Sequence, residues 1–353
     1  MESLELNFWK KKKIFITGHS GFKGSWLSRI LIDLGAEVSG LSLPLGKTNT
    51  LFVNAIQDDC YKNFFGDINE GSILEESLKE TKPDVLFHLA AQPLVYESYQ
   101  DPIKTFETNI IGTSKVMLAA LQVKSIKSLI NITSDKCYKN SGNISQSFKE
   151  DDPMGGDDPY SASKACAEIV SDSIKYSFFK DSSIGIANGR AGNVIGGGDY
   201  SENRLLPDVV KSINLGTPLP IRSPLAVRPW QHVLEPLFGY IELAEKIYHD
   251  KGNFEGGWNF GPEIEDCLRV EQILEIVKKF EPRFVYELCE NNEFQESQYL
   301  KLDINKAKNN LKWSPIWSAE KAILKTLEFN SLLNDSMAEK EILKKQINEY
   351  LSS

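Results

Sequence analysis

A tyrosine and a lysine four residues apart are the first residues in this chain whose types and spacing could do chemistry. Tyr160 and Lys164 lie near the start of a predicted helix, where residues four apart share one face. An ammonium held beside a phenol can lower the phenol pKa from its ordinary value of about 10. Such a phenolate can take a proton from a substrate hydroxyl. Because any amphipathic helix can carry this pair on its surface, the pattern needs support from other residues.

A second polar group follows a predicted buried strand at 127–133. Ser134, Asp135 and Lys136 place a hydroxyl, a carboxylate and an amine at the carboxyl end of that strand, where ligands bind in parallel sheets. Strict alternation would send Asp135 and Lys136 to opposite faces. For both to face one site, we expect the chain to curl as it leaves the strand. The alternative is a polar strand end that simply turns into a loop.

A glycine-rich turn joins the first predicted strand, 13–17, to the first predicted helix, 25–34. Gly18, Gly21 and Gly24 recur at three-residue spacing. Gly18 would permit the tight turn, Gly21 the approach of a pyrophosphate, and Gly24 close packing of helix on strand. The helix N-terminus would then face the anion. A plain strand–helix turn is the alternative.

Strands and helices alternate along the first half of the chain, which predicts an α/β fold with a Rossmann-type, doubly wound parallel sheet. Strands are expected at 13–17, 37–41, 63–68, 84–89, 127–133 and 183–189, with a late strand and turn at 258–262. We expect a NAD-binding domain over 1–190, joined by later crossing segments, and a smaller α/β substrate lobe with C-terminal helices over 191–353. A long helix at 103–121 should contain a buried Asn109 that bridges backbone groups.

The strand ends bear on the choice of cofactor. A NAD site often has an acidic residue after the second strand and a NADP site an arginine, whereas this chain has Ser42 there. The absence of an arginine favours NAD, although this position alone leaves the choice open, and Ser42 could serve a ribose hydroxyl. Asp67 could accept a hydrogen bond from an adenine amine, or it could cap a helix from Glu70. His88 is expected to be a packed structural residue.

The composition is that of an ordinary soluble globular protein. The 353 residues are 41% hydrophobic and 25% charged, with a net charge of −9, which argues against nucleic acid as the main partner. Five scattered cysteines without a CxxC pair predict free thiols and a cytoplasmic location. The four histidines predict no metal site, and no segment has the length of a membrane span. A helix is expected from Ser318, and the polar, helical segment beyond Asn330 should be peripheral.

Together these motifs resemble the extended short-chain dehydrogenase/reductase superfamily, in its sugar-nucleotide branch, over nearly the whole chain. Four stretches look like those of CDP-glucose 4,6-dehydratases: 17–27, 133–138, 192–199 and 228–236. The resemblance implies a lyase that makes a 4-keto-6-deoxy sugar from CDP-glucose, with a tightly held NAD regenerated in each cycle. It also implies a homo-oligomer, dimer or tetramer, that pairs through the helices beginning near Ile103 and Tyr160.

The same resemblance implies roles for individual residues. Tyr160 would take the proton of the sugar 4-hydroxyl while Ser134 orients it, and Lys164 would hold the cofactor ribose and lower the Tyr160 pKa. Asp135 would be the acid for the departing 6-hydroxyl. Lys136 stands where dehydratases of TDP- and GDP-sugars carry a glutamate as the C5 base. It could act as that base after its pKa is depressed, or stay charged and stabilise the enolate while another group takes the proton.

The resemblance also implies the binding residues. Besides Tyr160 and Lys164, those expected at the cofactor are Gly18, Ser20, Gly21, Phe22, Lys23, Gly24, Asp67, Ile68 and Ala90, and those expected at the substrate are Gln92, Asn193, Arg204 and Arg228. Asn193 would contact the substrate diphosphate, unless the glycine-rich loop 192–198 is a mere flexible turn. Arginine suits a diphosphate because its planar fork matches phosphate oxygens, although Arg204 could also lie on the solvated surface.

Two other functions fit part of the pattern. An epimerase of the same branch would share Tyr160 and Lys164 but does not need an acid–base pair after Ser134, so Asp135 and Lys136 favour a dehydratase. A non-catalytic cofactor-binding sensor would commonly lose the tyrosine or the lysine, and this chain keeps both.

Overall fold

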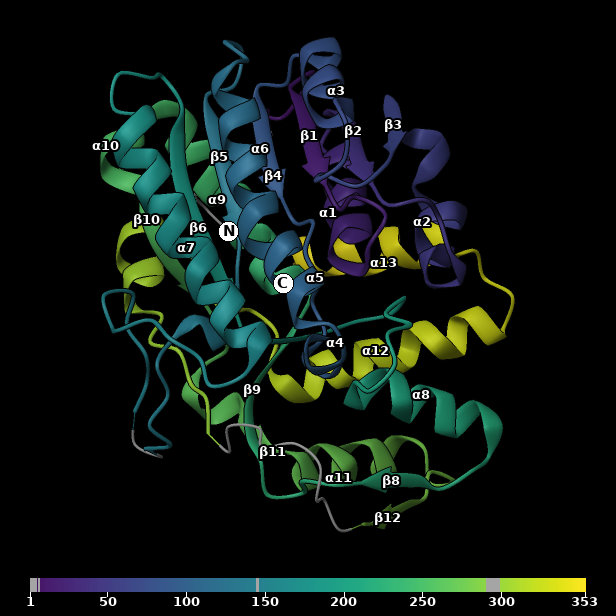
Figure 1. Ribbon diagram of the computed structural model, residues 1–353. Helices are drawn as coiled ribbons and strands as arrows, with labels where there is room; N and C mark the ends of the chain where they lie inside the picture. The colour runs from purple at the N-terminus through teal and green to yellow at the C-terminus, as the bar shows by residue number, and fades with distance from the viewer. Residues whose placement is uncertain (1–4, 6, 144–145, 290–298) are drawn as a thin grey trace.

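The computed structural model describes residues 5, 7–143, 146–289 and 299–353 and is organised around one seven-stranded parallel sheet (Figure 1). Its strands are β1 (Lys13–Thr17), β2 (Glu37–Ser42), β3 (Lys62–Phe65), β4 (Val85–His88), β5 (Ser128–Ile132), β6 (Gly185–Ala191) and β10 (Gly256–Phe260). Their order is β3-β2-β1-β4-β5-β6-β10, and every neighbouring pair is parallel. The winding reverses between β1 and β4, which places a ligand-binding crevice at the carboxyl ends of these strands. The predicted Rossmann-type sheet is confirmed.

Helices cover both faces of this sheet. One face carries α3 (Ile73–Thr81), α6 (Gly112–Leu121) and α7 (Pro159–Phe178), and the other carries α1 (Phe22–Asp33) and α9 (Leu234–His249). Every residue of β4, β5 and β6 is buried, as expected for parallel strands covered on both sides. Adjacent residues of β1 show the alternation, because Phe15 packs into one hydrophobic cluster and Ile16 into the other.

The long helix predicted over 103–121 contains one π turn. The segment α5 (Pro102–Phe106) continues into α6 through the π turn Glu107–Ile111. Asn109 lies inside this turn and is 1% exposed. Single π turns within helices occur frequently at functional sites.

Of the two alternatives for Asp67, a cap on a helix from Glu70 was wrong, and contact with an adenine amine stays a prediction. Gly71 has a φ of +59°, outside the right-handed helical region, and α3 begins at Ile73. Asp67 instead pairs with Lys104 of α5, whose Nζ lies 2.9 Å from Asp67 Oδ2.

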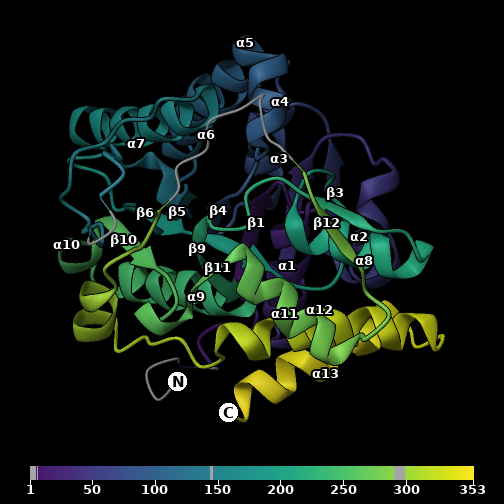
Figure 2. The ribbon, with the colours of Figure 1, turned by 90° about the horizontal axis from the view of Figure 1, so that it is seen from below.

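The chain after β6 builds a smaller lobe beside the carboxyl edge of the main sheet (Figures 1 and 2). Its elements are β7 (Asn193–Ile195), α8 (Leu205–Leu215), β8 (Leu219–Ile221), β9 (Val227–His232), β11 (Cys267–Arg269), α11 (Val270–Phe280), β12 (Tyr286–Leu288) and α12 (Ala319–Asn334). The strands form two small sheets, β11-β9-β7 and β12-β8. The division of the chain at residue 190 stays a prediction, and β10 joins the main sheet as a later crossing segment.

The remaining helices connect or close these layers. They are α2 (Thr50–Ala55), α4 (Val95–Gln100), α10 (Lys251–Phe254) and α13 (Glu339–Leu351). Among the residues that the structure describes, no helix is both long and apolar enough to cross a membrane, and no cluster of three potential metal-ligating acids, histidines or cysteines occurs. All five cysteines fall within the described part and are free thiols.

The prediction that the segment beyond Asn330 is peripheral was wrong. Apolar residues recur at helical spacing between the charged residues of α13, and Ile342, Leu343, Ile347 and Tyr350 are buried in the main core. The Tyr350 hydroxyl donates to Glu235 Oε2 of α9 at 2.7 Å, and the same carboxylate accepts from two backbone N–H groups just before α12. Glu235 therefore anchors both C-terminal helices to α9 and the main sheet.

Burial raises the pKa of Glu235 to about 7, against the opposing effect of its three hydrogen bonds. A carboxyl with a raised folded-state pKa contributes stability at low pH, and that contribution is lost as the pH rises from about 4.3 through the folded value. Relative to Glu235→Gln, the wild-type free energy of unfolding should fall by about 3 kcal/mol between about pH 5 and pH 8. Urea denaturation of both proteins tests this, and parallel pH profiles would contradict it.

Candidate active site

The turn between β1 and α1 is packed so closely that two of its glycines leave no room for a side chain. An ideal Cβ on Gly18 would lie 2.8 Å from Ala90 N, and the φ of Gly18 is +78°. A Cβ on Gly24 would lie 2.1 Å from the Gly18 carbonyl oxygen, whereas one on Gly21 would meet that oxygen at 3.4 Å and no other described atom within 4 Å. Gly18 and Gly24 therefore serve packing, and Gly21 faces open space.

The N-terminus of α1 is suited to an anion. Gly21 is its N-cap, and among the described residues no side chain caps the helix and no acid lies in its first turn. Free N–H groups and the helix dipole at such an end favour negative charge. Phe22 and Lys23 begin this helix. Burial, and then the charges of Arg204 and Lys164, lower the pKa of Lys23 to about 7. A diphosphate fits these donors.

Side chains that the sequence patterns did not reveal hold this turn in place. Ser42 Oγ accepts from Ser20 N at 3.0 Å and lies 2.7 Å from His19 Nδ1, while His19 Nε2 lies 3.1 Å from Asn63 Oδ1. Burial lowers the pKa of His19 to about 4, so the ring is neutral at physiological pH. Ser42 is engaged by the turn, which leaves the suggestion that it serves a ribose hydroxyl without support. Gly40 is the one feature of the sequence that could have indicated this packing, because a Cβ there would lie 2.3 Å from the His19 ring.

Two other predicted cofactor residues follow strands of the main sheet, Ile68 after β3 and Ala90 after β4. Ala90 N donates to Thr17 Oγ1 at 3.2 Å, and Ile68 is 6% exposed. His88 is the structural residue that the sequence predicted, because its two ring nitrogens contact the hydroxyls of Thr17 and Thr113 at 2.7 and 3.1 Å.

The chain curls as predicted where β5 ends. Asp135–Cys137 form a 3₁₀ turn, and Ser134 caps it by accepting from Lys136 N at 3.2 Å. Ser134 Oγ also donates to Asp135 Oδ1 at 3.0 Å, and Ser134 acts on the Tyr160 phenol by lowering its pKa. The hydroxyl, carboxyl and phenol singled out from the sequence therefore meet at one place.

Asp135 is set up to hold a proton. Its side chain is buried, and its Oδ2 has no hydrogen-bond partner among the described residues. Burial raises the pKa of Asp135, while the charge of Lys136, the Ser134 hydrogen bond and the charge of Arg228 oppose that rise. Gly192 lies so close that a Cβ there would be 2.9 Å from Oδ2. A buried carboxyl with an unpaired oxygen suits proton donation to a ligand.

Tyr160 and Lys164 occupy the first two turns of α7. Asp158 caps this helix by accepting from Ser161 N at 2.9 Å, and a proline fills the first helical position, which is a favourable start for a helix. Lys164 Nζ lies 3.5 Å from the Ile132 carbonyl oxygen at the end of β5. The start of α7 and the end of β5 therefore lie side by side, with Lys164 in contact with the strand.

Burial dominates the ionisation of this pair. It raises the pKa of Tyr160 to about 12, against the hydrogen bond with Ser134 and the charge of Arg204. It lowers the pKa of Lys164 to about 8, against the charge of Glu168. The sequence predicted that Lys164 lowers the Tyr160 pKa below 10. In the structure that pKa is raised instead, so the predicted direction was wrong. Helical spacing places the two groups on one face, but it carries no information on how deeply they are buried.

Asn109 is confirmed as a structural bridge. Its Oδ1 accepts from Gln92 N at 2.9 Å, and its Nδ2 donates to Gln92 O at 3.1 Å and to Ser163 Oγ at 2.8 Å. Ser163 Oγ donates in turn to Tyr160 O at 2.7 Å, so the π turn ties the loop after β4 to α7. The Gln92 side-chain amide is engaged within its own loop and with α5, and its role at the substrate stays a prediction.

The smaller lobe brings two arginines to the site. Arg204 pairs with Asp199 at 3.1 Å and reaches the Pro93 carbonyl oxygen at 3.4 Å, so it bridges the lobe to the loop after β4 rather than lying free on the surface. Arg228 of β9 is buried, and its charge acts on Asp135. Asn193 begins β7, which pairs with β9. The substrate-binding roles of these residues stay predictions.

The glycine-rich loop after β7 is packed, and the alternative of a flexible turn was wrong. A Cβ on Gly197 would lie 1.9 Å from the Phe329 ring of α12. Trp26 Nε1 of α1 donates to Gly197 O at 2.9 Å. This loop therefore packs closely between α1 and α12.

Known proteins resemble this chain over nearly its whole length. The family model for GDP-mannose 4,6 dehydratase matches residues 15–326. A CDP-glucose 4,6-dehydratase of Salmonella typhimurium is 41% identical, and the match covers 99% of both chains. A dTDP-glucose 4,6-dehydratase of Xanthomonas campestris is 24% identical over 89% of this chain and 92% of its own.

Solved structures share the fold. A UDP-glucuronic acid 4-epimerase from Bacillus cereus, in complex with UDP-glucuronic acid and NAD, aligns with a TM-score of 0.79 at 22% identity and covers 91% of this chain and 99% of its own. The epimerase Mth375 from Methanothermobacter thermautotrophicus has the same TM-score and identity and covers 97% of this chain and 96% of its own.

The glycine turn offers a matched pair of substitutions. Gly24→Ala should lower the free energy of unfolding by roughly 1–3 kcal/mol, because its methyl would overlap a backbone carbonyl. Gly21→Ala should change it by about 0.5 kcal/mol or less, because its conformation is extended and its surroundings are open. Chemical denaturation measures both, and equal losses would contradict this account of the turn.

Proposed function

The chain belongs to the GDP-mannose 4,6-dehydratase family of sugar-nucleotide dehydratases, and on that premise we propose that it is an NAD-dependent CDP-glucose 4,6-dehydratase. This hydro-lyase would convert CDP-D-glucose to CDP-4-dehydro-6-deoxy-D-glucose and water. The observation that carries the proposal is the 41% identity over 99% of both chains with the Salmonella enzyme of that name. Asp135 and Lys136 support the same substrate, because this pair replaces the Asp-Glu typical of dehydratases of TDP- and GDP-sugars.

We assign NAD to the glycine turn. The N-terminus of α1 and the open side of Gly21 would receive its diphosphate, and Lys164 would hold the ribose hydroxyls. The close packing at Gly18 and Gly24 fixes the turn, so that the open side of Gly21 is available to such a ligand. NAD bound there would supply the hydride acceptor for C4 of the sugar and the hydride donor for C6, so the cycle would have no net redox change. The Bacillus cereus neighbour with NAD in its complex supports this choice.

Ser134 and Tyr160 would act on the sugar 4-hydroxyl. Ser134 lowers the Tyr160 pKa, so a hydroxyl that can orient the substrate acts on the phenol that can take its proton. Because burial raises the Tyr160 pKa, the proton transfer needs positive charge around the phenol. Arg204 opposes that rise, and Lys164, with a pKa of about 8, is still protonated at neutral pH.

Asp135 and Lys136 would carry out the loss of water. Once C4 is a ketone, the proton on C5 is acidic and the 6-hydroxyl can leave. Asp135, whose pKa burial raises, would give its proton to the departing hydroxyl. Lys136, beside it on the same turn, would take the C5 proton or hold the enolate with its charge.

Two copies of the chain would pair through α5, α6 and α7. These helices lie on one side of the main sheet (Figure 1), and their outward apolar side chains include Ile103, Ile111, Leu118, Ile169 and Tyr176, which are 42% to 73% exposed. A second copy could cover them as a four-helix interface. Light scattering that gives the monomer mass at micromolar concentration would contradict this.

The free thiols support a cytoplasmic location.

A panel of CDP, TDP, GDP and UDP sugars tests the substrate. We expect a 4-keto product, detected by its ultraviolet absorbance in strong base, with kcat/KM for CDP-glucose at least about 100-fold above the others, as expected for a site built around its substrate's polar groups. Gly21→Ala should weaken NAD binding while the protein stays folded. A chain that turns over none of the four sugars is not a dehydratase of this class.

Residues 134–137, which we call the catalytic turn, carry both Asp135 and Lys136. Substitutions in this turn separate the elimination of water from the oxidation at C4. Asp135→Asn should lower kcat by about 10²- to 10⁴-fold, because the acid for the 6-hydroxyl is lost, yet the substrate C5 proton should still exchange with deuterated water. Lys136→Ala should abolish that exchange if the lysine is the base. The exposed Lys139 nearby provides the control Lys139→Ala. Exchange at the normal rate in Lys136→Ala would exclude the lysine as base.

A further inference from the structure

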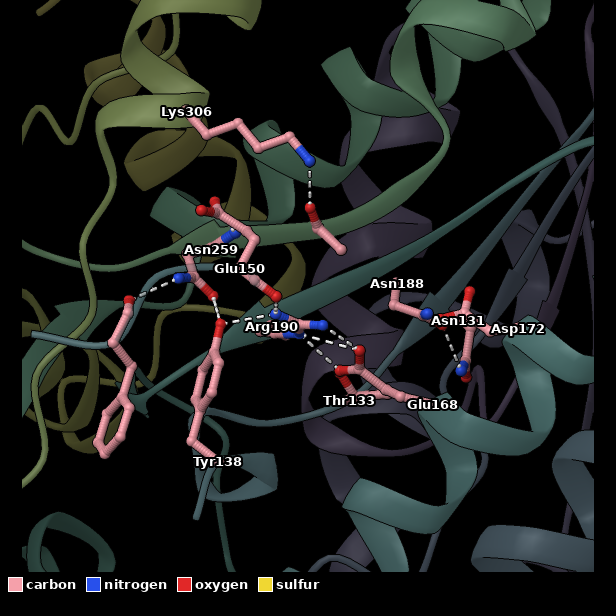
Figure 3. A network of polar contacts seen from close by, with 12 residues as sticks. Asn131, Thr133, Tyr138, Glu150, Glu168, Asp172, Asn188, Arg190, Asn259 and Lys306 are labelled. Atoms are coloured by element: carbon pink, nitrogen blue, oxygen red, sulfur yellow. Dashed lines mark hydrogen bonds and ion pairs between the residues drawn. The ribbon is translucent and has the colours of Figure 1, made fainter. Parts of the chain in front are cut away.

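A buried ion pair lies behind the catalytic turn and takes no part in the proposed chemical steps. Glu168 of α7 and Arg190 of β6 are 0% and 2% exposed. Arg190 Nε donates to the two Glu168 oxygens at 2.8 and 2.9 Å, and a terminal nitrogen donates to Oε2 at 2.5 Å (Figure 3). Desolvating two charges is costly, and such pairs can often be replaced by apolar residues without loss of stability. Stability alone is therefore a weak reason for this pair.

The pair holds the catalytic turn at both of its ends. Thr133, directly before Ser134, donates its hydroxyl to Glu168 Oε1 at 2.5 Å. Tyr138, directly after the 3₁₀ turn, accepts from Arg190 at 2.6 Å through its phenol oxygen. One arm of the ion pair thus binds the residue that enters the turn, and the other binds the residue that leaves it (Figure 3).

The same pair fixes the helix that carries the phenol. Glu168 follows Lys164 by four residues, so both side chains lie on the face of α7 that packs against the sheet. Lys164 contacts the Ile132 carbonyl oxygen, and Glu168 contacts Thr133, the next residue on the strand. Any sliding of α7 along the sheet would break the Glu168–Arg190 contacts.

Further contacts keep the arms themselves rigid. The Tyr138 hydroxyl donates to Asn259 Oδ1 at 2.7 Å, and its ring stacks on Phe148 at a centroid distance of 4.9 Å. Arg190 also donates to the Glu150 carbonyl oxygen at 2.8 Å. A buried polar network whose members are satisfied in this way specifies one arrangement.

We propose that Glu168 and Arg190 are positioning residues that fix the catalytic turn, residues 134–137, against the first two turns of α7. They touch neither substrate nor cofactor in this account and position the turn through Thr133 and Tyr138, and the charge of Glu168 also acts on Lys164. A displacement of reacting groups by about 1 Å can cost on the order of 100-fold in rate, so loss of the pair should lower kcat rather than substrate affinity. The kinetic part of this inference rests on the proposed function.

The chain offers a matched control on the same two strands. Asn131 of β5 and Asn188 of β6 are register partners, and Asn131 Nδ2 donates to Asn188 Oδ1 at 2.9 Å. Thr133 and Arg190 each lie two residues further along, so all four side chains share one face of the sheet. The asparagine pair is buried and polar, and no dashed contact in Figure 3 joins it to the catalytic turn.

The test compares Glu168→Gln, Glu168→Gln/Arg190→Met and the control Asn131→Ala/Asn188→Ala. Glu168→Gln leaves the buried Arg190 guanidinium without a negatively charged partner, so this variant should lose the most thermal stability. The double variant should regain most of it, because both charges are gone, yet its kcat should stay about 10- to 100-fold low with KM within about threefold of wild type. The control should lose stability and keep kcat. A double variant with wild-type kcat would overturn the proposal.

Two further measurements keep the test decisive. Hydrogen exchange should show that residues 133–138 and the start of α7 lose protection in the double variant and not in the control; unchanged protection there overturns the proposal even if the chain acts on none of the sugars. If the double variant does not fold, Tyr138→Phe decides, since it removes only one arm. Its kcat should fall by about three- to tenfold at unchanged KM, and a wild-type kcat would again overturn the proposal.

Discussion

The placement of the turn that carries Ser134, Asp135 and Lys136 depends on a charged contact that is buried away from water. Glu168 and Arg190 join α7 to β6 beside the end of β5, where the catalytic turn begins. Glu168 also accepts a hydrogen bond from Thr133, directly before that turn, and Arg190 donates one to Tyr138, directly after it. Three segments distant in sequence are thereby held in one geometry. A parallel sheet brings its strand ends to a common edge, but only specific side-chain contacts set the ångström-scale placement that proton transfer needs.

Burial then determines the chemistry of the groups so placed. Loss of hydration acts on each in the direction that favours its neutral form: it raises the pKa of Tyr160 and Asp135 and lowers the pKa of Lys164 and Lys23. An acid that keeps its proton and lysines that give theirs up more readily are suited to shuttling protons near neutral pH. A site of this kind gains its reactivity from being closed as much as from the residues it contains.

Much of this could be read from local patterns, because the signals lie close together in the sequence. The glycine spacing at 18–24, the polar end of β5 and the Tyr160–Lys164 pair each occupy a short stretch, and the parallel sheet follows from the alternation of strands with helices. What could not be read depends on partners far apart: Glu168 with Arg190, or Glu235 with the C-terminal Tyr350. The direction of the Tyr160 pKa shift was missed for the same reason, since burial comes from the whole fold.

The most direct test of the proposed chemistry follows a deuterium atom placed on C4 of CDP-glucose. An enzyme that oxidises C4, eliminates water and returns the same hydride should deliver the deuterium to C6 of the 4-keto-6-deoxy product within one active site. Nuclear magnetic resonance and mass spectrometry of the product locate the label. Deuterium at C6 is the predicted result. Deuterium found at C4 of an epimerised sugar, or lost to solvent while product forms, would contradict the account.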